Sequence, residues 1–298
     1  MKGMILAAGL GTRLRPLSYE LPKPIVPVLG RPLCSYNMEF LSRSGVRSFV
    51  MNLHTRPKLI QQCVAGWTRG KIRVDYTVEP EILGTGGGIW NARAFLAEGT
   101  FVTANSDTMV RFPFSDALAF HRGKKALATL VLFPDPHGKY TPVGLDGEGR
   151  ITGFGNAAGG VASGFYTGFQ IVEPALLGEI PPGRPSCIVR DTYMRLADKG
   201  APVFGFLSSG SFREFGSPSD YLEGTLALLS ERPAGKEEPS SRRAGVEILP
   251  PAYIAPGAKI APGARIGPGA VIEDGAEVKE GASVTRAILT PRRRVDIP

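Results

Sequence analysis

Short apolar runs alternate with helical patterns along most of the chain. Leu33, Tyr36, Phe40 and Leu41 recur at helical spacing, and Gly45 is a natural stop after them. The apolar runs between such helices are short enough to be strands. We expect strands over 4–8, 46–53, 72–78, 101–104, 126–133, 143–145, 151–154, 164–172 and 203–207, and helices over 32–44, from 57, from the glycines near 84 to 96, over 188–199 and over 218–230. This alternation favours an α/β fold with a Rossmann-like, mostly parallel sheet flanked by helices.

A different period begins near residue 246. Apolar residues recur at every sixth position, at Ile248, Ile254, Ile260, Ile266, Ile272, Val278 and Val284. This period is neither helical nor alternating, and is typical of a hexapeptide β-helix, in which each side of a triangular coil contributes one inward residue. Seven repeats fill little more than two coils. We expect a short left-handed parallel β-helix whose open end docks on the main domain or on a second subunit, so the protein could be a homo-oligomer.

The segment between the two patterns has the composition of a linker. Residues 233–245 are charged and rich in Pro, Ser and Gly. We therefore expect a main domain at 1–231, a linker at 232–245, and the β-helix with its tail at 246–298. Arg292, Arg293 and Arg294 fall in that tail, where solvated charge is the ordinary expectation.

Charge and cysteine content narrow the function classes. A net charge of +8 suits a polyanionic substrate, whereas no stripe of Lys and Arg interleaved with aromatic residues indicates nucleic acid. No apolar run approaches about 18 residues, so we expect no membrane span. The chain enters a strand almost at once, which argues against a signal peptide. Its three cysteines have no metal-like spacing and fit reduced thiols in a cytoplasmic protein.

The stretch 4–27 holds the densest candidate chemistry. Its apolar strand breaks at Gly9 and Gly11, residues that can take backbone angles denied to others, and Arg13 and Arg15 follow at once. A glycine-rich turn after a strand aims backbone N–H groups at an anion, and nearby arginines deepen that preference. We interpret the stretch as a cradle for a nucleoside triphosphate.

Lys23 adds a further cation to this stretch. It stands between two prolines, whose restricted backbones should hold its amine out on a stiff arm. Two other interpretations of the stretch are weaker. The dinucleotide fingerprint needs a glycine or alanine where Leu14 stands, and no Lys-Ser or Lys-Thr pair closes a P-loop. A nicotinamide-dependent dehydrogenase is therefore a distant alternative.

Two further groups follow expected strands, where ligands of parallel sheets bind. The glycine-rich stretch 83–90 would let a flat base or sugar lie against bare backbone, although a plain flexible loop is the alternative. Asp107 comes directly after the strand that begins at Phe101. A carboxylate beside phosphates needs a cation between them, and Mg²⁺ takes only one or two carboxylates because phosphate oxygens and waters complete its octahedron. An ordinary turn aspartate is the alternative there.

The sequence Leu6-Ala-Ala-Gly-Leu-Gly-Thr-Arg-Leu-Arg-Pro-Leu17, followed by Pro22-Lys-Pro-Ile-Val-Pro-Val-Leu-Gly-Arg-Pro-Leu33, closely resembles the signature of bacterial sugar-1-phosphate nucleotidyltransferases. This family of NDP-sugar pyrophosphorylases includes mannose-1-phosphate guanylyltransferases and N-acetylmuramate-1-phosphate uridylyltransferases. Family-like features recur to about residue 230. The resemblance implies a nucleoside triphosphate and a sugar 1-phosphate as partners, Mg²⁺ as cofactor, and an NDP-sugar and pyrophosphate as products.

The resemblance also implies roles for individual residues. Arg13 would grip the leaving phosphates and Lys23 the reacting phosphate, which makes them the catalytic candidates. Asp107 and Glu214 would hold the metal. The nucleotide-binding candidates are Ala7, Ala8, Gly9, Gly11, Thr12, Gly84, Thr85 and Gly86. The sugar-binding candidates are Gly144, Asn156 and Thr167.

The chain departs from the family pattern at several places. Glu214 stands for the second metal-binding aspartate, Phe212 for a tryptophan, and Asn156 lies where many relatives carry a Glu-Lys-Pro whose lysine holds the sugar phosphate. Lys139 and Arg190 are candidate substitutes for that lysine, with surface charge as the alternative. These departures leave open a non-catalytic regulatory subunit that binds nucleotide sugars. Among catalytic alternatives, overall likeness favours guanylyl transfer to a mannose- or heptose-type sugar over uridylyl transfer.

The expected reaction needs no general base. A sugar phosphate is mostly dianionic near pH 7, because the second pKa of a phosphate monoester is about 6. Its oxygen can attack the α-phosphorus directly, so the burden falls on alignment and charge neutralisation. We therefore expect Arg13 and Lys23 to share one cleft with Asp107.

Overall fold

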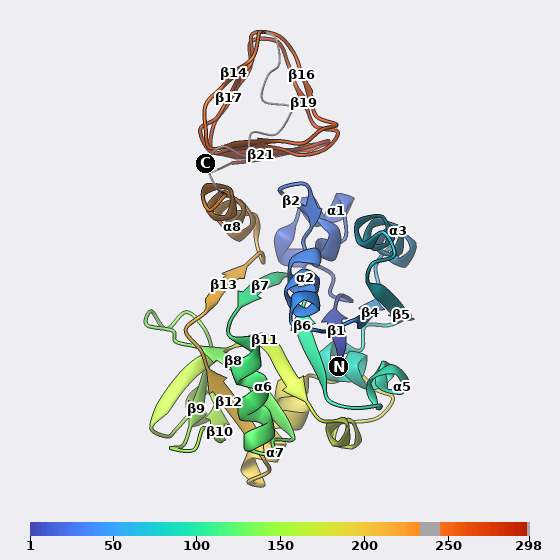
Figure 1. Ribbon diagram of the computed structural model, residues 1–298, viewed down its shortest axis with the longest axis vertical. Coiled ribbons are helices and arrows are strands. Elements are labelled where there is room, and N and C mark those ends of the chain that lie inside the picture. The colour runs from blue at the N-terminus through green and yellow to red at the C-terminus, as the bar shows by residue number, and fades with distance from the viewer. Residues whose placement is uncertain (233–244, 297–298) are drawn as a thin grey trace. The chain divides into compact units, whose positions relative to one another are not determined.

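The computed structural model describes residues 1–232 and 245–296, which belong to two compact units (Figure 1). The first unit comprises Met1–Leu10 and Cys34–Phe212, and the second comprises Gly11–Leu33 and Arg213–Pro298. The signature stretch is therefore split, and most of it shares a unit with the C-terminal part of the chain. The division at residues 231 and 245 stays a prediction, and its linker lies almost entirely outside the described residues.

A nine-stranded sheet forms the first unit, in the order β10-β9-β11-β6-β1-β4-β5, with β8 also on β11 and β12 on β8. The strands are β1 (Lys2–Leu6), β4 (Ser48–Leu53), β5 (Arg73–Val78), β6 (Phe101–Asn105), β8 (Ala128–Phe133), β9 (Pro142–Leu145), β10 (Ile151–Phe154), β11 (Ala162–Val172) and β12 (Val203–Leu207). The pairs β1–β4, β1–β6, β4–β5 and β8–β12 are parallel, whereas β11 runs antiparallel to its neighbours. The predicted α/β class with a mostly parallel central sheet is confirmed.

Helices connect these strands much as the sequence predicts. They are α2 (Ser35–Arg43), α3 (Pro57–Thr68), α4 (Gly84–Asn91), α5 (Arg93–Leu96), α6 (Phe114–Gly123) and α7 (Met194–Asp198), with 3-10 turns η3 (Gly155–Ala157) and η4 (Pro174–Gly178) and a π-helical turn η5 (Val189–Tyr193) before α7. Gly45 and Gly200, the predicted stops, have φ angles of 94° and 66°. Only glycine takes such angles readily, so each ends its helix.

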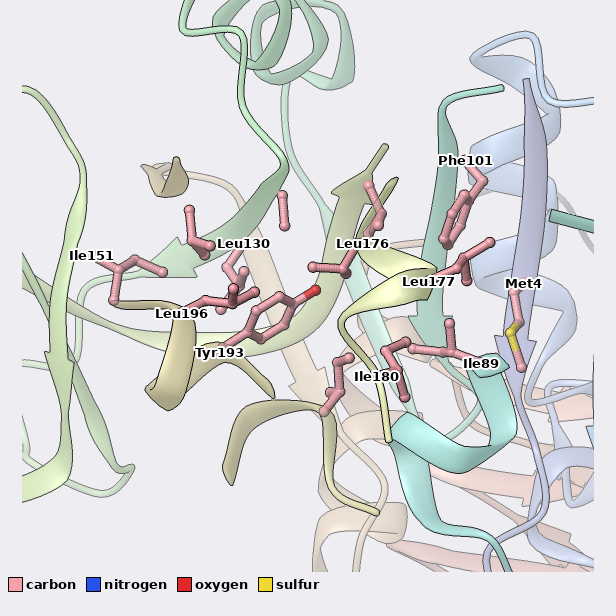
Figure 2. Packing of buried hydrophobic residues seen from close by; sticks show 14 of the residues in the cluster. Met4, Ile89, Phe101, Leu130, Ile151, Leu176, Leu177, Ile180, Tyr193 and Leu196 are labelled. Carbon is pink, nitrogen blue, oxygen red and sulfur yellow. The ribbon is translucent and has the colours of Figure 1, made fainter. Parts of the chain in front are cut away.

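One face of the sheet packs against α4, α5, η4 and the helical segment that ends in α7. Met4 and Val50 of the parallel strands belong to this core, together with Leu130 of β8. Figure 2 shows Tyr193 and Leu196 lying against Leu130. On another face, the ring of Phe40 in α2 packs against rings from α6 and β11, with centroids 6.1 to 6.4 Å away. Apolar side chains on both faces of its central strands hold the sheet in place.

The second unit joins the signature segment to the C-terminal elements. It contains η1 (Thr12–Leu14), α1 (Leu17–Glu20), η2 (Lys23–Ile25), the hairpin of β2 (Pro27–Val28) and β3 (Arg31–Pro32), and α8 (Pro218–Ser230). Helix α8 begins as predicted. The Ser217 hydroxyl accepts from the Asp220 amide and the Asp220 carboxylate accepts from the Ser217 amide, which is a capping box. Of the two remaining short strands, β7 (Thr108–Arg111) belongs to the first unit, and β13 (Ser211–Glu214) spans the boundary between the two units just before α8.

The six-residue repeats form three short parallel sheets that Figure 1 shows as the sides of a triangle. Their strands are β14 (Glu247–Ile248), β15 (Ala252–Ile254), β16 (Lys259–Ile260), β17 (Arg265–Ile266), β18 (Ala270–Ile272), β19 (Glu277–Val278), β20 (Ser283–Val284), β21 (Ala287–Thr290) and β22 (Arg293–Asp296). The short β-helix is confirmed, whereas its handedness and its role in oligomers stay predictions.

The last turn of the β-helix differs from the sequence pattern. Strand β21 forms a further side of the coil that the six-residue period did not predict. Ala252 pairs with Ala270, but Ala270 pairs with Ala287, so the last turn is one residue shorter than the turn before it. Arg293 and Arg294 lie in β22, which pairs antiparallel with β21. Both side chains are exposed, so the expectation of solvated charge holds although these residues belong to a strand. Among the residues that the structure describes, no helix is long and apolar enough to cross a membrane.

Candidate functional site

The carboxyl ends of the parallel strands carry a network of polar contacts. Strand β1 ends at Leu6 and not at the predicted Ala8, because the Ala7 amide donates to the Asn52 side chain at 2.9 Å. Asn52 in turn donates to the buried carboxylate of Glu79 at 2.8 Å, and Glu79 accepts from the Leu83 amide at 2.9 Å. This network fixes the start of the loop that follows β1 relative to the start of α4. Sequence reasoning missed Asn52 and Glu79, although both close or follow expected strands.

The predicted base-binding glycines lie inside α4 and not in a loop before it. Gly84 has a φ of 69°, and a Cβ there would fall 2.6 Å from the carbonyl oxygen of Ser186. A Cβ on Gly86 would fall 2.7 Å from the Ser186 hydroxyl. The Thr85 hydroxyl accepts from the Ile188 amide at 3.0 Å. Close packing against the segment around Ser186 therefore explains why glycine stands at positions 84 and 86. Contact of these residues with a nucleotide stays a prediction.

Asp107 lies half-buried in the turn between β6 and β7, where the sequence placed it. Buried Asn37 of α2 holds this turn, because its side chain donates to the carbonyl oxygens of Asn105 and Thr108 at 3.1 and 2.8 Å. The Asn105 side chain packs on Gly168, whose φ is 80° and whose Cβ would fall only 2.2 Å from it. Asn37 and Gly168 thus fix the backbone that presents the Asp107 carboxylate.

The second unit brings Gly11 and Lys23 together. Gly11 has a φ of 63°, whereas Gly9 does not have a positive φ, so only one of the two glycines needs its conformational freedom. A Cβ on Gly11 would fall 3.0 Å from Cβ of Lys23. Thr12 begins η1 directly after Gly11. Lys23 is only 8% exposed, so the expectation of an amine held out on a stiff arm was wrong. Pro22 instead caps a buried 3-10 turn that contains both Lys23 and Pro24.

Arg13 and Glu214 lie side by side in the same unit. Their nearest atoms, Nη2 and Oε1, are 3.4 Å apart, with the arginine side chain 69% exposed and the glutamate side chain 18% exposed. A Cβ on Gly216 would fall 2.7 Å from Glu214 Oε1, so glycine leaves room for the carboxylate. A predicted phosphate-binding cation therefore flanks a predicted metal ligand. That Arg13 and Lys23 share a cleft with Asp107 stays a prediction.

The donor set is compatible with Mg²⁺ bound together with a nucleotide. The described residues contain no group of three or more His, Cys, Asp or Glu that could hold a metal ion by itself. Mg²⁺ on phosphates needs only one or two carboxylates and otherwise keeps waters. Half-buried Asp107 and the largely buried Glu214 are carboxylates of this kind. Their role as metal ligands stays a prediction.

The three predicted sugar-binding residues differ in what they can offer a ligand. The Thr167 hydroxyl is buried and donates to the Val131 carbonyl oxygen at 2.9 Å. Gly144 is buried, and a Cβ there would fall 2.1 Å from the Gly159 carbonyl oxygen. Asn156 is exposed in η3. Burial also raises the pKa of the neighbouring Tyr166, which keeps its hydroxyl neutral. The sugar-binding role of the three residues stays a prediction.

A cavity of about 490 Å³ opens where β8 and β12 end. Aromatic side chains line it, and the Tyr140 and Phe165 rings stack with centroids 4.2 Å apart. The Asp135 carboxylate accepts from the Tyr140 amide at 2.6 Å, and this bond holds the pKa of Asp135 below its usual value. The Lys139 amine lies 5.1 Å from the Tyr140 ring. Arg190, the other candidate cation, pairs with the neighbouring Asp191.

Comparison with known proteins matches residues 2–231 to the family described as nucleotidyl transferase. The mannose-1-phosphate guanyltransferase of Schizosaccharomyces pombe is 32% identical over 259 residues, which cover 85% of this chain and 68% of that protein. The UTP–glucose-1-phosphate uridylyltransferase of Synechocystis is 27% identical over 270 residues, which again cover 85% of this chain and 68% of that protein. The chain thus spans about two thirds of the length of these relatives.

A solved structure supports the same fold. The crystal structure of HddC from Yersinia pseudotuberculosis has a TM-score of 0.65 with 24% identity, and the match covers 76% of this chain and 99% of that one. The match of the family across the sheet, helices and signature loop confirms the resemblance that the signature residues indicated. The chain belongs to the nucleotidyl transferase family.

Proposed function

We propose that this chain transfers a guanylyl group from GTP to a sugar 1-phosphate and releases pyrophosphate. Nucleotidyl transfer follows from the family, and the guanyltransferase is the more similar of the two relatives described above. The observation that carries the proposal is that one unit holds both the contact of Gly11 with Lys23 and the contact of Arg13 with Glu214. A plain tight turn after a strand would not need a buried lysine beside its left-handed glycine.

In this proposal the chain supplies alignment and positive charge. The sugar phosphate oxygen attacks the α-phosphorus, a new P–O bond forms, and the bond to the β-phosphate bridge breaks as pyrophosphate leaves. Exposed Arg13 would meet the departing phosphates, and the Lys23 amine would neutralise charge that develops at the α-phosphorus. Because Lys23 is buried, its charge would be screened by less water and would act more strongly. Asp107 and Glu214 would hold Mg²⁺, which would neutralise phosphate charge.

The sugar end would lie at the aromatic cavity beside β8 and β12. Stacked Tyr140 and Phe165 offer an apolar face, and Ser208 and Ser209 of the same cavity offer hydroxyl groups. Sugars combine apolar C–H faces with many hydroxyls, so this lining suits them. Lys139 is the better placed substitute for the missing family lysine, because it lines this cavity and its amine lies beside the Tyr140 ring, whereas Arg190 is not among the lining residues.

The decisive experiment is a pyrophosphate-release screen of all four nucleoside triphosphates against a panel of sugar 1-phosphates with Mg²⁺. The proposal expects GTP with a mannose- or heptose-type sugar to give the highest kcat/KM. Preference for UTP would replace guanylyl by uridylyl transfer and leave the reaction class intact. Tight nucleotide binding in calorimetry without turnover on any sugar phosphate would instead favour a regulatory subunit.

A further inference from the structure

The hairpin that follows Lys23 ends in a turn with an unusual pair of backbone angles. Leu29 and Gly30, at its tip, have φ angles of 50° and 75°, so both adopt the left-handed conformation. Two consecutive left-handed residues make a tight hairpin turn, and consecutive backbone N–H groups can form a small anion-binding concavity. A leucine in this conformation is strained, and such strain persists only where the surroundings enforce it.

A carboxylate of the β-helix occupies this concavity. The Gly30 amide donates to Glu273 Oε2 at 2.9 Å, and the Leu29 amide also bonds to this carboxylate. Glu273 directly follows β18 and is completely buried, with its own amide bonded to the Leu289 carbonyl oxygen at 2.8 Å. Within the described residues, its Oε1 atom accepts no hydrogen bond. The tip is also closely packed, because a Cβ on Gly30 would fall 2.0 Å from the Tyr253 hydroxyl.

The complete burial of the Glu273 carboxyl group is energetically costly. Removing a carboxylate from water is unfavourable, and only good hydrogen bonds offset the cost. Burial raises the pKa of Glu273 to about 7. Near neutral pH the group is therefore partly ionised, and its burial then destabilises the folded state. The neighbouring inward positions of the β-helix, such as Ile272 and Ile254, are apolar and need no such contact. Glu273 therefore stands out as a residue fitted to the hairpin tip and not to the coil.

A continuous set of backbone bonds links the tip to Lys23. The Leu33 amide donates to the Val26 carbonyl oxygen at 3.1 Å and closes the hairpin. The Val26 amide donates to the Lys23 carbonyl oxygen at 3.3 Å and closes η2. From α8, the Tyr221 hydroxyl donates to the Pro27 carbonyl oxygen at 2.6 Å. Because the hairpin and η2 are joined without a loop, a shift at the tip moves the backbone of Lys23.

We propose that Glu273 is a positioning residue for nucleotidyl transfer, which fixes the hairpin tip and through it the Lys23 backbone. This inference rests on the proposed function, in which Lys23 meets the reacting phosphate. The β-helix then contributes to the reaction geometry through a residue that acts on the backbone of the hairpin and not on a substrate. Small displacements of a reacting group lower rates strongly, because much of the barrier reduction depends on alignment.

The test uses the full chain and compares E273A with E273Q and with the control E280Q. Glu280 is an exposed glutamate of the same β-helix, so E280Q makes the same substitution at a position away from the hairpin. Alanine leaves the tip amides without an acceptor, whereas the glutamine amide oxygen can still accept from Gly30. We expect E273A to lower kcat by about tenfold or more with a smaller change in KM, E273Q to restore most of kcat, and E280Q to match the wild type.

A second readout does not depend on turnover. The reactivity of the Lys23 amine towards an acylating reagent, measured by peptide mass spectrometry on the folded proteins, should rise several-fold in E273A and stay low in E280Q. If E273A does not fold, E273D withdraws the carboxylate by one methylene and serves in its place. Unchanged kcat and unchanged Lys23 reactivity in a folded variant would overturn the inference. Absence of turnover in the wild type would instead count against the proposed function, and the Lys23 readout would still decide this inference.

Discussion

Replacing Glu273 by glutamine should remove a pH dependence of stability that the wild type shows between about pH 5 and pH 8. The carboxyl group is completely buried, and burial raises its folded-state pKa from 4.5 to about 7. The amides of Gly30 and Leu29 oppose this rise, and the nearby charge of Asp274 adds to it. Because the folded pKa lies above the unfolded pKa, the folded state favours the neutral acid. The contribution of Glu273 to stability is therefore complete below about pH 4.5 and is lost as the pH rises through about 7.

The size of the effect follows from the pKa shift. Each pKa unit corresponds to about 1.4 kcal/mol, so the full rise is equivalent to roughly 3 kcal/mol between acid and alkaline limits. Most of it, on the order of 2 to 3 kcal/mol, should appear between about pH 5 and pH 8. Glutamine has a similar shape and does not ionise, so E273Q should lack this loss. A single change of this size is a large fraction of the stability of an ordinary domain.

The assay is urea unfolding followed by circular dichroism at a series of pH values, for the wild type, E273Q and E280Q. Other titrating groups contribute equally to all three proteins, so the difference in unfolding free energy between variants isolates Glu273. We expect the wild type to lose stability relative to E273Q as the pH rises, and E280Q to follow the wild type. Parallel pH profiles for wild type and E273Q would show that the Glu273 pKa is not raised, and would refute the reasoning.

Three further predictions concern the site itself. D107N should abolish pyrophosphate release with the productive substrates while leaving thermal unfolding unchanged, and near-normal turnover would remove Asp107 from the metal site. R13K should lower kcat by about 10² or more, because an ammonium cannot reproduce the guanidinium contacts, and an unchanged kcat would contradict a role on the leaving phosphates. G168A should lose roughly 2 to 3 kcal/mol in urea unfolding, since its Cβ would strike Asn105 and its φ is positive; stability equal to the wild type would refute that steric argument.

The sequence predicted those parts of the structure that depend only on residues close together in the chain. The cap at Ser217 and the stop at Gly45 appear where the sequence placed them, because each depends on a few adjacent backbone groups. The six-residue period also predicted the β-helix, since every rung repeats the same inward position. It failed only at the last rung, where Leu289 pairs with Ile272 out of period.

Contacts between distant parts of the chain could not be predicted in this way. Nothing adjacent to Asn37 or Glu79 in sequence indicates that these side chains hold the Asp107 turn and the start of α4. The glycines at Gly84 and Gly86 illustrate the same limit. A glycine run is equally suited to a ligand and to a segment of the protein that packs against it, and here the partner is Ser186, about a hundred residues away.

The contacts of residues 11–33 suggest a structural role for a β-helix of little more than two coils, namely to orient this segment. Three C-terminal elements hold the segment at separate points, through Glu273 on the hairpin tip, Tyr221 on Pro27, and Arg293 on Glu20 at 2.7 Å. The exposed ion pair alone would contribute at most about 1 kcal/mol. Three contacts at different places along a short segment nevertheless restrict its rotation as well as its position. A coil too short to enclose a site of its own can therefore set the orientation of the segment that carries Arg13 and Lys23.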